Sequence, residues 1–246
     1  MQLNLANCLA DIDVVILAGG LGTRLRSVLT DKPKVLAPVG QRTFLDVLLD
    51  RLAAFGARRI ILSLGHLAGE VTEHLSAFPR VDMTILPLVE PAPLGTAGAI
   101  RFVRPYLESA TVLVLNGDSL IDADLSDFVA AHRAAGAEGT LLCARVPDAA
   151  RYGTVWVNSL HRIVSFHEKT GENVPGAINA GMYLMDTAML DRIATAMGPS
   201  LERNVFQTLP AGSLAAHVGD FAFLDIGVPE DLAKAEAFVA ARLDGY

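Results

Sequence analysis

The sequence predicts an α/β fold built on a doubly wound, mostly parallel sheet, and three observations lead to this prediction. Short apolar runs rich in valine, isoleucine and leucine alternate with longer segments whose apolar residues recur at helical spacing. The short runs are apolar throughout, as strands are when helices cover both faces of a sheet. The order of strand, helix and strand repeats over the first half of the chain, and this repetition favours parallel strands.

The first half contains the elements of a Rossmann-like sheet and extends over about residues 12–138. A β-branched run at 14–17 predicts the first strand, which leads directly into a glycine-rich loop at 18–22. The first helix is expected to end at Gly56, because glycine is common just beyond a helix. The expected elements after the loop are a helix at 44–55, a strand at 59–64, a helix at 71–75, a strand at 83–88, a helix at 96–107 and a strand at 111–115.

From residue 139 the pattern changes to strands with short connections and no helix among them. These strands are expected at 140–146, 153–157, 163–168 and 178–185, and the alternation over 162–167 is typical of a half-exposed antiparallel strand. The rest of the chain predicts helices near 187–196 and 199–209, strands at 213–218 and 221–225, and a closing helix from Pro229. The whole is expected to form one unit, residues 1–246, with an antiparallel insertion at about 139–228 and a C-terminal helix at 229–243.

The composition narrows the class of protein. The chain has 246 residues, 52% of them hydrophobic, and carries 27 acidic against 20 basic side chains. This apolar content excludes intrinsic disorder, and no apolar run reaches the roughly 18–20 residues of a membrane-spanning helix. The acidic balance argues against nucleic-acid binding, and Cys8 and Cys143 lie too far apart for a metal-ligand spacing. We expect a cytoplasmic globular protein with no membrane or nucleic-acid partner; a homo-oligomer is left open.

The loop after the first strand has the composition of a phosphate-binding loop. Residues 17–26 read LAGGLGTRLR, and glycines let backbone N–H groups approach an anion without interference from Cβ. The dinucleotide-binding fingerprint is absent because Leu25 stands where its third glycine belongs, and the P-loop sequence is absent as well. The segment Lys32-Pro33-Lys34 follows and places two ammonium groups on a stiff backbone. Taken alone, the glycine loop is explained equally well as a tight turn, and a lone lysine pair usually forms a solvated basic turn.

Six segments in one order give the chain a resemblance to a known family. They are LAGGxGTRL at 17–25 with KPK at 32–34, PLGTAG at 93–98, LNGD at 115–118, EK at 168–169, NAGxY at 179–183 and DIG at 225–227. Together they resemble the signature of the sugar-1-phosphate nucleotidylyltransferases, over residues 13 to about 240. Within that family the chain is most similar to the D-glycero-D-manno-heptose 1-phosphate guanylyltransferases, on the segments 20–27, 94–100 and 225–231.

The resemblance implies a fold of the nucleotide-diphospho-sugar transferase type and a definite reaction. In that reaction an oxygen of a sugar 1-phosphate attacks the α-phosphorus of a nucleoside triphosphate, with GTP favoured, and pyrophosphate leaves. Position and electrostatics carry most of the catalysis in such transfers. By this resemblance Arg24 and Lys34 bind the nucleotide phosphates, and Lys169 binds the sugar phosphate.

The resemblance also implies a metal site and two groups of binding residues. Asp118 lies just beyond one expected strand and Asp225 at the end of another, where ligands of open α/β sheets bind. A pair of carboxylates suits Mg²⁺. The implied nucleotide-binding residues are Leu17, Ala18, Gly19, Gly20, Gly22, Thr23, Glu90, Gly95 and Thr96. The implied sugar-binding residues are Asn116, Gly117, Glu168, Asn179 and Gly181.

Glu90 bears on the choice of base. Relatives that use pyrimidine nucleotides tend to have an amide at this point of the similar loop, whereas a carboxylate only accepts hydrogen bonds. Guanine offers adjacent N1–H and N2–H donors, which suit two carboxylate oxygens, and this favours GTP. The alternative is that Glu90 faces solvent ahead of Pro91 and Pro93.

Three other functions compete with this hypothesis. A uridylyltransferase acting on another sugar 1-phosphate, such as a hexose or muramic acid phosphate, shares the same motifs. A nucleotide- or sugar-phosphate-binding domain without turnover is disfavoured, because all the charged residues needed for turnover are present. A dinucleotide-dependent oxidoreductase is disfavoured by the missing third glycine and by the lack of an acidic residue at a ribose position.

Overall fold

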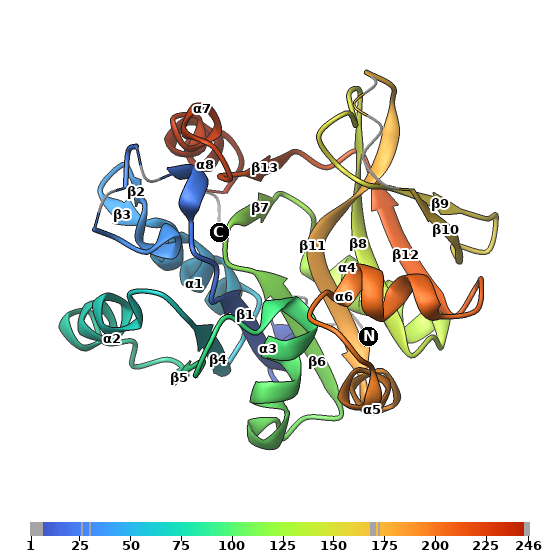
Figure 1. Ribbon diagram of the computed structural model, residues 1–246, viewed down its shortest axis with the longest axis horizontal. Coiled ribbons are helices and arrows are strands. Elements are labelled where there is room, and N and C mark those ends of the chain that lie inside the picture. Colours follow the sequence, from blue (N-terminus) through green and yellow to red (C-terminus); the bar gives the residue numbers. More distant parts are fainter. Residues whose placement is uncertain (1–6, 26, 30, 168–170, 172, 244–246) are drawn as a thin grey trace.

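The computed structural model describes residues 7–25, 27–29, 31–167, 171 and 173–243, and their centre is one large mixed sheet. One row of hydrogen-bonded strands in it runs in the order β12-β8-β11-β6-β1-β4-β5 (Figure 1). The pairs β1–β4, β1–β6, β4–β5 and β8–β12 are parallel, whereas β11 is antiparallel to β6 and β8. The strands are β1 (Asp13–Ala18), β4 (Arg59–Leu64), β5 (Thr84–Val89), β6 (Thr111–Asn116), β8 (Gly139–Val146), β11 (Gly176–Asp186) and β12 (Leu214–Gly219).

The parallel half of the sheet is buried because helices cover both of its faces. In β1, Val14 and Ile16 pack into one apolar core while Val15 packs into the other. One core receives helices α1 (Phe44–Ala54), α2 (Ala68–Ala77), α4 (Leu125–Ala135) and α8 (Ala235–Arg242). The other receives α3 (Gly95–Val103), α5 (Thr187–Thr195) and α6 (Leu201–Asn204). The doubly wound α/β fold predicted from the sequence is therefore confirmed.

The second half adds an antiparallel part, as expected. A short hairpin of β9 (Thr154–Val157) and β10 (Ile163–His167) pairs with β11 and lies at the right of Figure 1. The register of β11 against β8 shifts between Asn179 and Met182. The insertion is not antiparallel throughout, since β12 pairs in parallel with β8.

Several elements differ from the expectation. Helix α4 was not predicted, although Asp124 caps its start and Gly136 (φ 55°) ends it. The helix expected at 96–107 ends at Val103 and continues as a 3₁₀ turn, η4 (Arg104–Tyr106), because Pro105 supplies no backbone N–H. The helix expected at 199–209 is divided into α6 and η5 (Phe206–Thr208), and the closing helix into α7 (Pro229–Leu232) and α8.

Two small strand pairings were also not predicted. They are β2 (Pro38–Val39) with β3 (Arg42–Thr43), and β7 (Ser119–Ile121) with β13 (Phe223–Asp225). Of these strands, β13 corresponds to the strand expected at 221–225. The pair β7–β13 lies between the two halves of the molecule in Figure 1. It brings the chain just after β6 next to a segment over a hundred residues later, and so assembles part of the candidate site.

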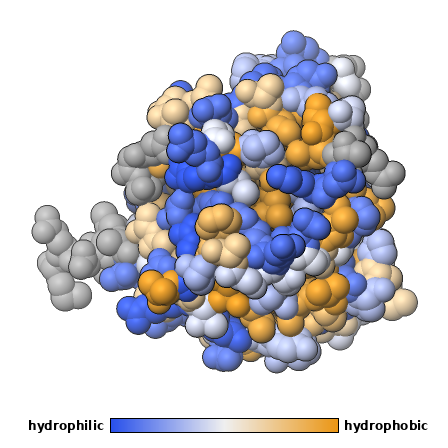
Figure 2. Space-filling model, turned by 90° about the vertical axis from the view of Figure 1, so that its left-hand side faces the viewer, coloured by the Kyte–Doolittle hydropathy of each residue, from blue (hydrophilic) through white to orange (hydrophobic). Residues whose placement is uncertain are grey.

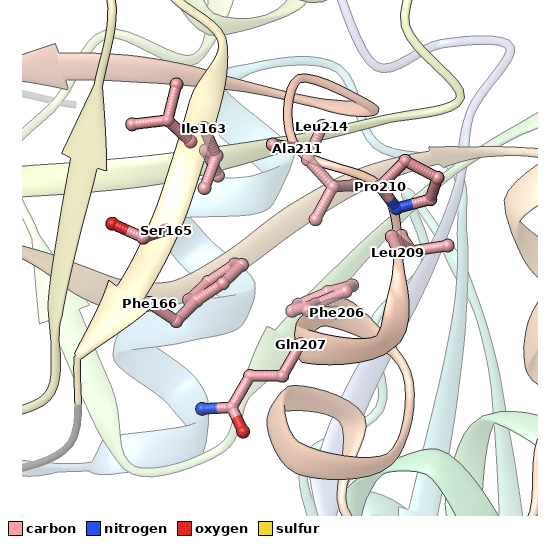
Figure 3. Close-up of a pocket in the computed structure, with 10 residues that line it drawn as sticks. Ile163, Ser165, Phe166, Phe206, Gln207, Leu209, Pro210, Ala211 and Leu214 are labelled. Carbon is pink, nitrogen blue, oxygen red and sulfur yellow. The ribbon is translucent and has the colours of Figure 1, made fainter.

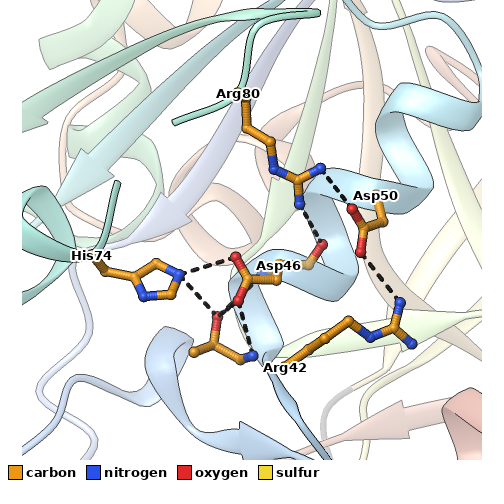
Figure 4. Close-up of polar contacts among 6 residues, drawn as sticks. Arg42, Asp46, Asp50, His74 and Arg80 are labelled. Atoms are coloured by element: carbon orange, nitrogen blue, oxygen red, sulfur yellow. Dashed lines mark hydrogen bonds and ion pairs between the residues drawn. The ribbon is translucent and has the colours of Figure 1, made fainter. Parts of the chain in front are cut away.

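A polar network fixes the start of α1 (Figure 4). Thr43 and Asp46 form a reciprocal cap, and His74 of α2 lies 3.0 Å from Asp46 Oδ1. Arg80 contacts Asp50 at 2.6 Å. The cap satisfies backbone N–H groups at the N-terminus of α1 and so stabilises the start of this helix.

The face toward α2 and the β2–β3 turn mixes hydrophilic and hydrophobic side chains (Figure 2). Among the described residues, no helix has both the length and the apolar character needed to cross a membrane.

Candidate active site

The carboxyl ends of the parallel strands surround a cavity of about 310 Å³. Leu17 pairs with Ser63 on one side and Asn116 on the other, so β1, β4 and β6 end at the same edge. The residues that line the cavity are Leu17, Gly19, Gly20, Leu21, Glu90, Pro93, Leu94, Gly95, Thr96, Ala99, Asn116 and Asp118. Six of the expected nucleotide-binding residues therefore lie together, and the expected strand-end carboxylate joins them.

Glu90 forms part of the cavity wall and is held from two sides. Its side chain is buried, with a residue exposure of 8%, so the alternative of a solvent-facing Glu90 is wrong. Ser63 Oγ donates to Oε1 at 2.8 Å, and the Leu94 N–H donates to Oε2 at 3.1 Å. A Cβ on Gly19 would lie 2.7 Å from Glu90 Cδ. The absence of a side chain at Gly19 therefore makes room for this carboxylate.

The glycine loop and the basic segment lie side by side. Gly20, Gly22, Lys32 and Lys34 line a small cleft of about 20 Å³, and Gly22 has a left-handed backbone (φ 57°). The two parts of the expected phosphate site are thus adjacent in space. The neighbouring residues are arranged differently: Thr23 and Arg24 are exposed, while Ala18 packs against the core.

Lys34 lies between the two carboxylates expected to bind metal. Its Nζ is 2.5 Å from Asp118 Oδ2 and 3.7 Å from Asp225 Oδ1. The β7–β13 pairing brings Asp225 here, and the Ile226 N–H donates to the Asp118 carbonyl at 3.0 Å. Arg24 reaches the same turn, since a Cβ on Gly227 would lie 3.1 Å from its Nη2.

The donor atoms of this cluster fit a magnesium ion bound together with phosphate. Asp225 Oδ1 is buried and has no hydrogen-bond partner. Burial, reinforced by the Asp118 carboxylate, raises the pKa of Asp225. Within the described ranges no cluster of three or more His, Cys, Asp or Glu side chains could hold a metal. Two carboxylates without further protein ligands suit Mg²⁺, which usually takes one or two carboxylates and completes its shell with phosphate oxygens and water.

A second cavity, of about 390 Å³, adjoins the first at Asn116. Asn116 and Asn179 were expected to contact the sugar, and both line it. Glu168 and Lys169 lie outside the described residues; in the sequence they follow His167, which lines this cavity. The remaining lining residues are Tyr152, Gly153, Thr154, Val155, Phe166, Ser200, Glu202, Arg203 and Gln207.

Two glycines expected at the sugar, Gly117 and Gly181, lie next to Asn116 of the second cavity or to the end of β1. Gly181 has a left-handed backbone (φ 73°) at the register shift of β11, and a Cβ there would lie 2.5 Å from Asn116 Nδ2. Gly117 donates its N–H to the Leu17 carbonyl at 2.9 Å. Both glycines leave space around Asn116 and the end of β1, and neither lines the cavity.

A buried tyrosine organises the floor of the second cavity. Asn179 Nδ2 donates to the Tyr183 hydroxyl at 2.8 Å, and this hydroxyl donates to Glu202 Oε1 at 3.2 Å. Burial and the nearby Glu202 carboxylate raise the pKa of Tyr183 well above its usual value. Tyr152, Glu202 and Arg203 were not predicted as site residues, because no motif surrounds them in the sequence.

The two cavities are linked through the start of α3. The Leu201 N–H donates to Thr96 Oγ1 at 2.8 Å, and the Ala97 N–H donates to the Pro199 carbonyl at 2.9 Å. Gly95 has a left-handed backbone (φ 71°), and a Cβ there would lie 2.6 Å from the same carbonyl. The loop that borders the first cavity is thereby fixed to the segment that borders the second.

A third pocket of about 440 Å³, lined mostly by hydrophobic residues, shares Phe166 and Gln207 with the second cavity (Figure 3). The rings of Phe166 and Phe206 stack with centroids 6.0 Å apart and an interplanar angle of 16°. Phe166 therefore stands in the wall between the two.

Comparison with known proteins gives concordant results. The profile of the family described as nucleotidyl transferase matches residues 13–242. Mannose-1-phosphate guanylyltransferase of Mycobacterium tuberculosis is 35% identical over 92% of this chain, which spans only 64% of that relative.

Two further similar proteins are matched over nearly their whole length. D-glycero-alpha-D-manno-heptose 1-phosphate guanylyltransferase of Campylobacter jejuni is 32% identical over 89% of this chain and 96% of its own. HddC from Yersinia pseudotuberculosis, solved in complex with GMP-PN, has a TM-score of 0.81 and 33% identity over 92% of this chain and 98% of its own. The resemblance predicted from the six motifs is confirmed: the chain belongs to the nucleotidyl transferase family.

Proposed function

We propose that this protein transfers a guanylyl group from GTP to a sugar 1-phosphate and releases pyrophosphate. The observation that carries the proposal is the meeting of two cavities at Asn116, beside the cluster of Lys34, Asp118 and Asp225. One cavity has the size and the glycine loop for a nucleotide, and the other has polar groups for a sugar. Reaction between two bound anions needs such an arrangement, because the protein must hold them together against their repulsion.

The charged residues have separate tasks in this proposal. Arg24 and Lys34 neutralise the nucleotide phosphates, and Lys169 holds the sugar phosphate in line with the α-phosphorus. Arginine suits bidentate phosphate contacts and lysine a point contact, so neither substitutes freely for the other. Asp118 and Asp225 would hold a magnesium ion, which when bound offsets charge on the transferring group.

Base selection is assigned to Glu90. Ser63 and Leu94 each occupy one acceptor position on its two oxygens. A carboxylate oxygen has further lone pairs, so both oxygens keep acceptor capacity for the N1–H and N2–H of guanine. The GMP-PN complex of the Yersinia neighbour supports a guanine nucleotide.

The sugar is proposed to have the manno configuration, with a D-glycero-D-manno-heptose 1-phosphate as the first candidate. The similar proteins act, by their names, on mannose 1-phosphate or on a heptose 1-phosphate of this configuration. The two acceptors differ by one carbon. The cytoplasm is the proposed compartment, as expected from the sequence.

The test is a matrix of four nucleoside triphosphates against a panel of sugar 1-phosphates with Mg²⁺, read by pyrophosphate release and product mass. GDP-heptose or GDP-mannose as the main product supports the proposal. UDP-sugars as the main products would establish the uridylyltransferase instead. Binding of both substrates without any product would establish a binding domain.

A further inference from the structure

We infer that Ser63, which belongs to none of the recognised motifs, is a positioning residue for base selection. It acts by fixing the carboxylate of Glu90. The inference rests on the proposed role of Glu90 in reading guanine.

Ser63 is the polar residue in the buried part of its strand, residues 60–64. Strand β4 reads RIILSL, and the Ser63 side chain is fully buried. A hydroxyl in such a place costs free energy unless it is hydrogen-bonded. Its partner is Oε1 of Glu90, the residue that directly follows the adjacent strand β5. The hydroxyl can only donate here, because an ionised carboxylate offers acceptors alone.

The surroundings fix the plane of the Glu90 carboxylate. One donor holds each oxygen, Ser63 Oγ on Oε1 and the Leu94 N–H on Oε2. Gly19 closes one side, where even a Cβ would collide with the carboxylate. Two donors and one packed side fix the rotation of the group. The lone pairs of Glu90 that are not used by these donors therefore have a fixed direction. Glu90 lines the first cavity, so a base bound there meets acceptors in a fixed orientation.

The fixed orientation of the carboxylate affects the choice between bases more than the overall affinity for a nucleotide. Two parallel hydrogen bonds to N1–H and N2–H need both oxygens in the plane of the base. Without Ser63 the carboxylate keeps the Leu94 N–H on Oε2 but loses the donor that fixes Oε1, and with it a fixed orientation. Hypoxanthine has N1–H but lacks the 2-amino group, so the ratio of GTP to ITP affinity reports the second hydrogen bond directly.

The experiment measures equilibrium binding of GTP and ITP with Mg²⁺ and without sugar, by calorimetry. In Ser63→Ala the GTP-to-ITP affinity ratio should fall about tenfold. This is the size expected when the 2-amino group of guanine loses its hydrogen bond to the Glu90 carboxylate. Ser63→Thr retains the hydroxyl and should restore most of the ratio. Thr140→Val is the matched control: it removes another buried hydroxyl, which contacts His132 far from the cavity, and should leave the ratio unchanged.

The variant Glu90→Gln distinguishes an error about Ser63 from an error about the proposed role of Glu90. If this variant lowers the ratio and Ser63→Ala does not, Glu90 reads the base and the role of Ser63 is refuted. If neither variant changes the ratio, the base is read elsewhere and both assignments fall. In the double variant, Ser63→Ala should add little to Glu90→Gln; full additivity would contradict action through Glu90. Should Ser63→Ala not fold, Ser63→Cys keeps the size with a weak donor, and an unchanged ratio there equally refutes the inference.

Discussion

Replacing Asp225 by asparagine should lower turnover strongly without lowering the stability of the folded protein. The substitution keeps the shape of the side chain and removes its charge. In the structure Asp225 Oδ1 is buried without a hydrogen-bond partner, and the nearest cation, Lys34 Nζ, is 3.7 Å away. Loss of one charge that acts on the developing transition state typically lowers turnover by about 10²–10³, or about 3–4 kcal/mol of barrier. We expect a loss of this size in Asp225→Asn.

The same charge weakens the folded state. Burial and Asp118 raise the pKa of Asp225 above its ordinary value of 3.8, so the folded protein disfavours the ionised form. The penalty is absent at pH values below this ordinary pKa, grows as pH rises from there toward the higher folded-state pKa, and is complete above it. Without divalent metal, Asp225→Asn should therefore be at least as stable as the wild type at neutral pH, and any gain should vanish near pH 4.

The assay combines thermal unfolding from pH 4 to pH 8 in EDTA with pyrophosphate release at saturating Mg²⁺. Added Mg²⁺ should raise the unfolding temperature of the wild type more than that of Asp225→Asn. Asp220→Asn is the control, because this carboxylate is exposed (85%) and should change neither quantity. Turnover close to wild type in Asp225→Asn would refute the metal assignment. A clearly lower unfolding temperature at neutral pH would refute the electrostatic reasoning.

Three further predictions concern other parts of the site. Lys34→Ala should raise the KM for GTP, whereas Lys169→Ala should raise chiefly the KM for the sugar 1-phosphate. Steady-state kinetics with each substrate varied in turn measures both values. If both variants changed the KM of the same substrate, the division of the site into a nucleotide part and a sugar-phosphate part would be contradicted. Gly181→Ala forces a left-handed backbone and a contact with Asn116, so calorimetry should show a loss of about 1–3 kcal/mol in stability; an unchanged unfolding temperature would count against it. Tyr183→Phe should cost about 1–3 kcal/mol by removing the hydrogen bonds of the hydroxyl to the half-buried Asn179 and Glu202. It should also raise the KM for the sugar 1-phosphate; an unchanged sugar KM would argue that this hydroxyl has no influence on the second cavity.

The elements that the sequence predicted best are those whose pattern follows directly from burial. Strands β1, β4 and β6 have buried centres and read as continuous apolar runs. Helix α4 was missed although Asp124 and Gly136 mark its ends, so the signal was present in the chain. The short pair β7–β13 depends on contact between distant segments, and no local pattern announces it.

In the candidate site, too, residues within local motifs were predicted, whereas contacts between distant elements were not. The motif residues at strand ends were predicted because the ends of parallel strands meet at one edge of a sheet. The contacts of Ser63 and Glu202 were not predictable, since each depends on a partner from another element. Gly19 was predicted as part of a phosphate loop, and the structure adds that it makes room for Glu90.

The most direct test of the central claim follows the phosphorus atoms of GTP. The protein is incubated with Mg²⁺, D-glycero-D-manno-heptose 1-phosphate or mannose 1-phosphate, and GTP labelled at the α- or the γ-phosphorus. Guanylyl transfer predicts that the α label appears in a GDP-sugar and the γ label in pyrophosphate, in equal amounts. Release of the γ label as inorganic phosphate, or no transfer of the α label to either sugar, would contradict it.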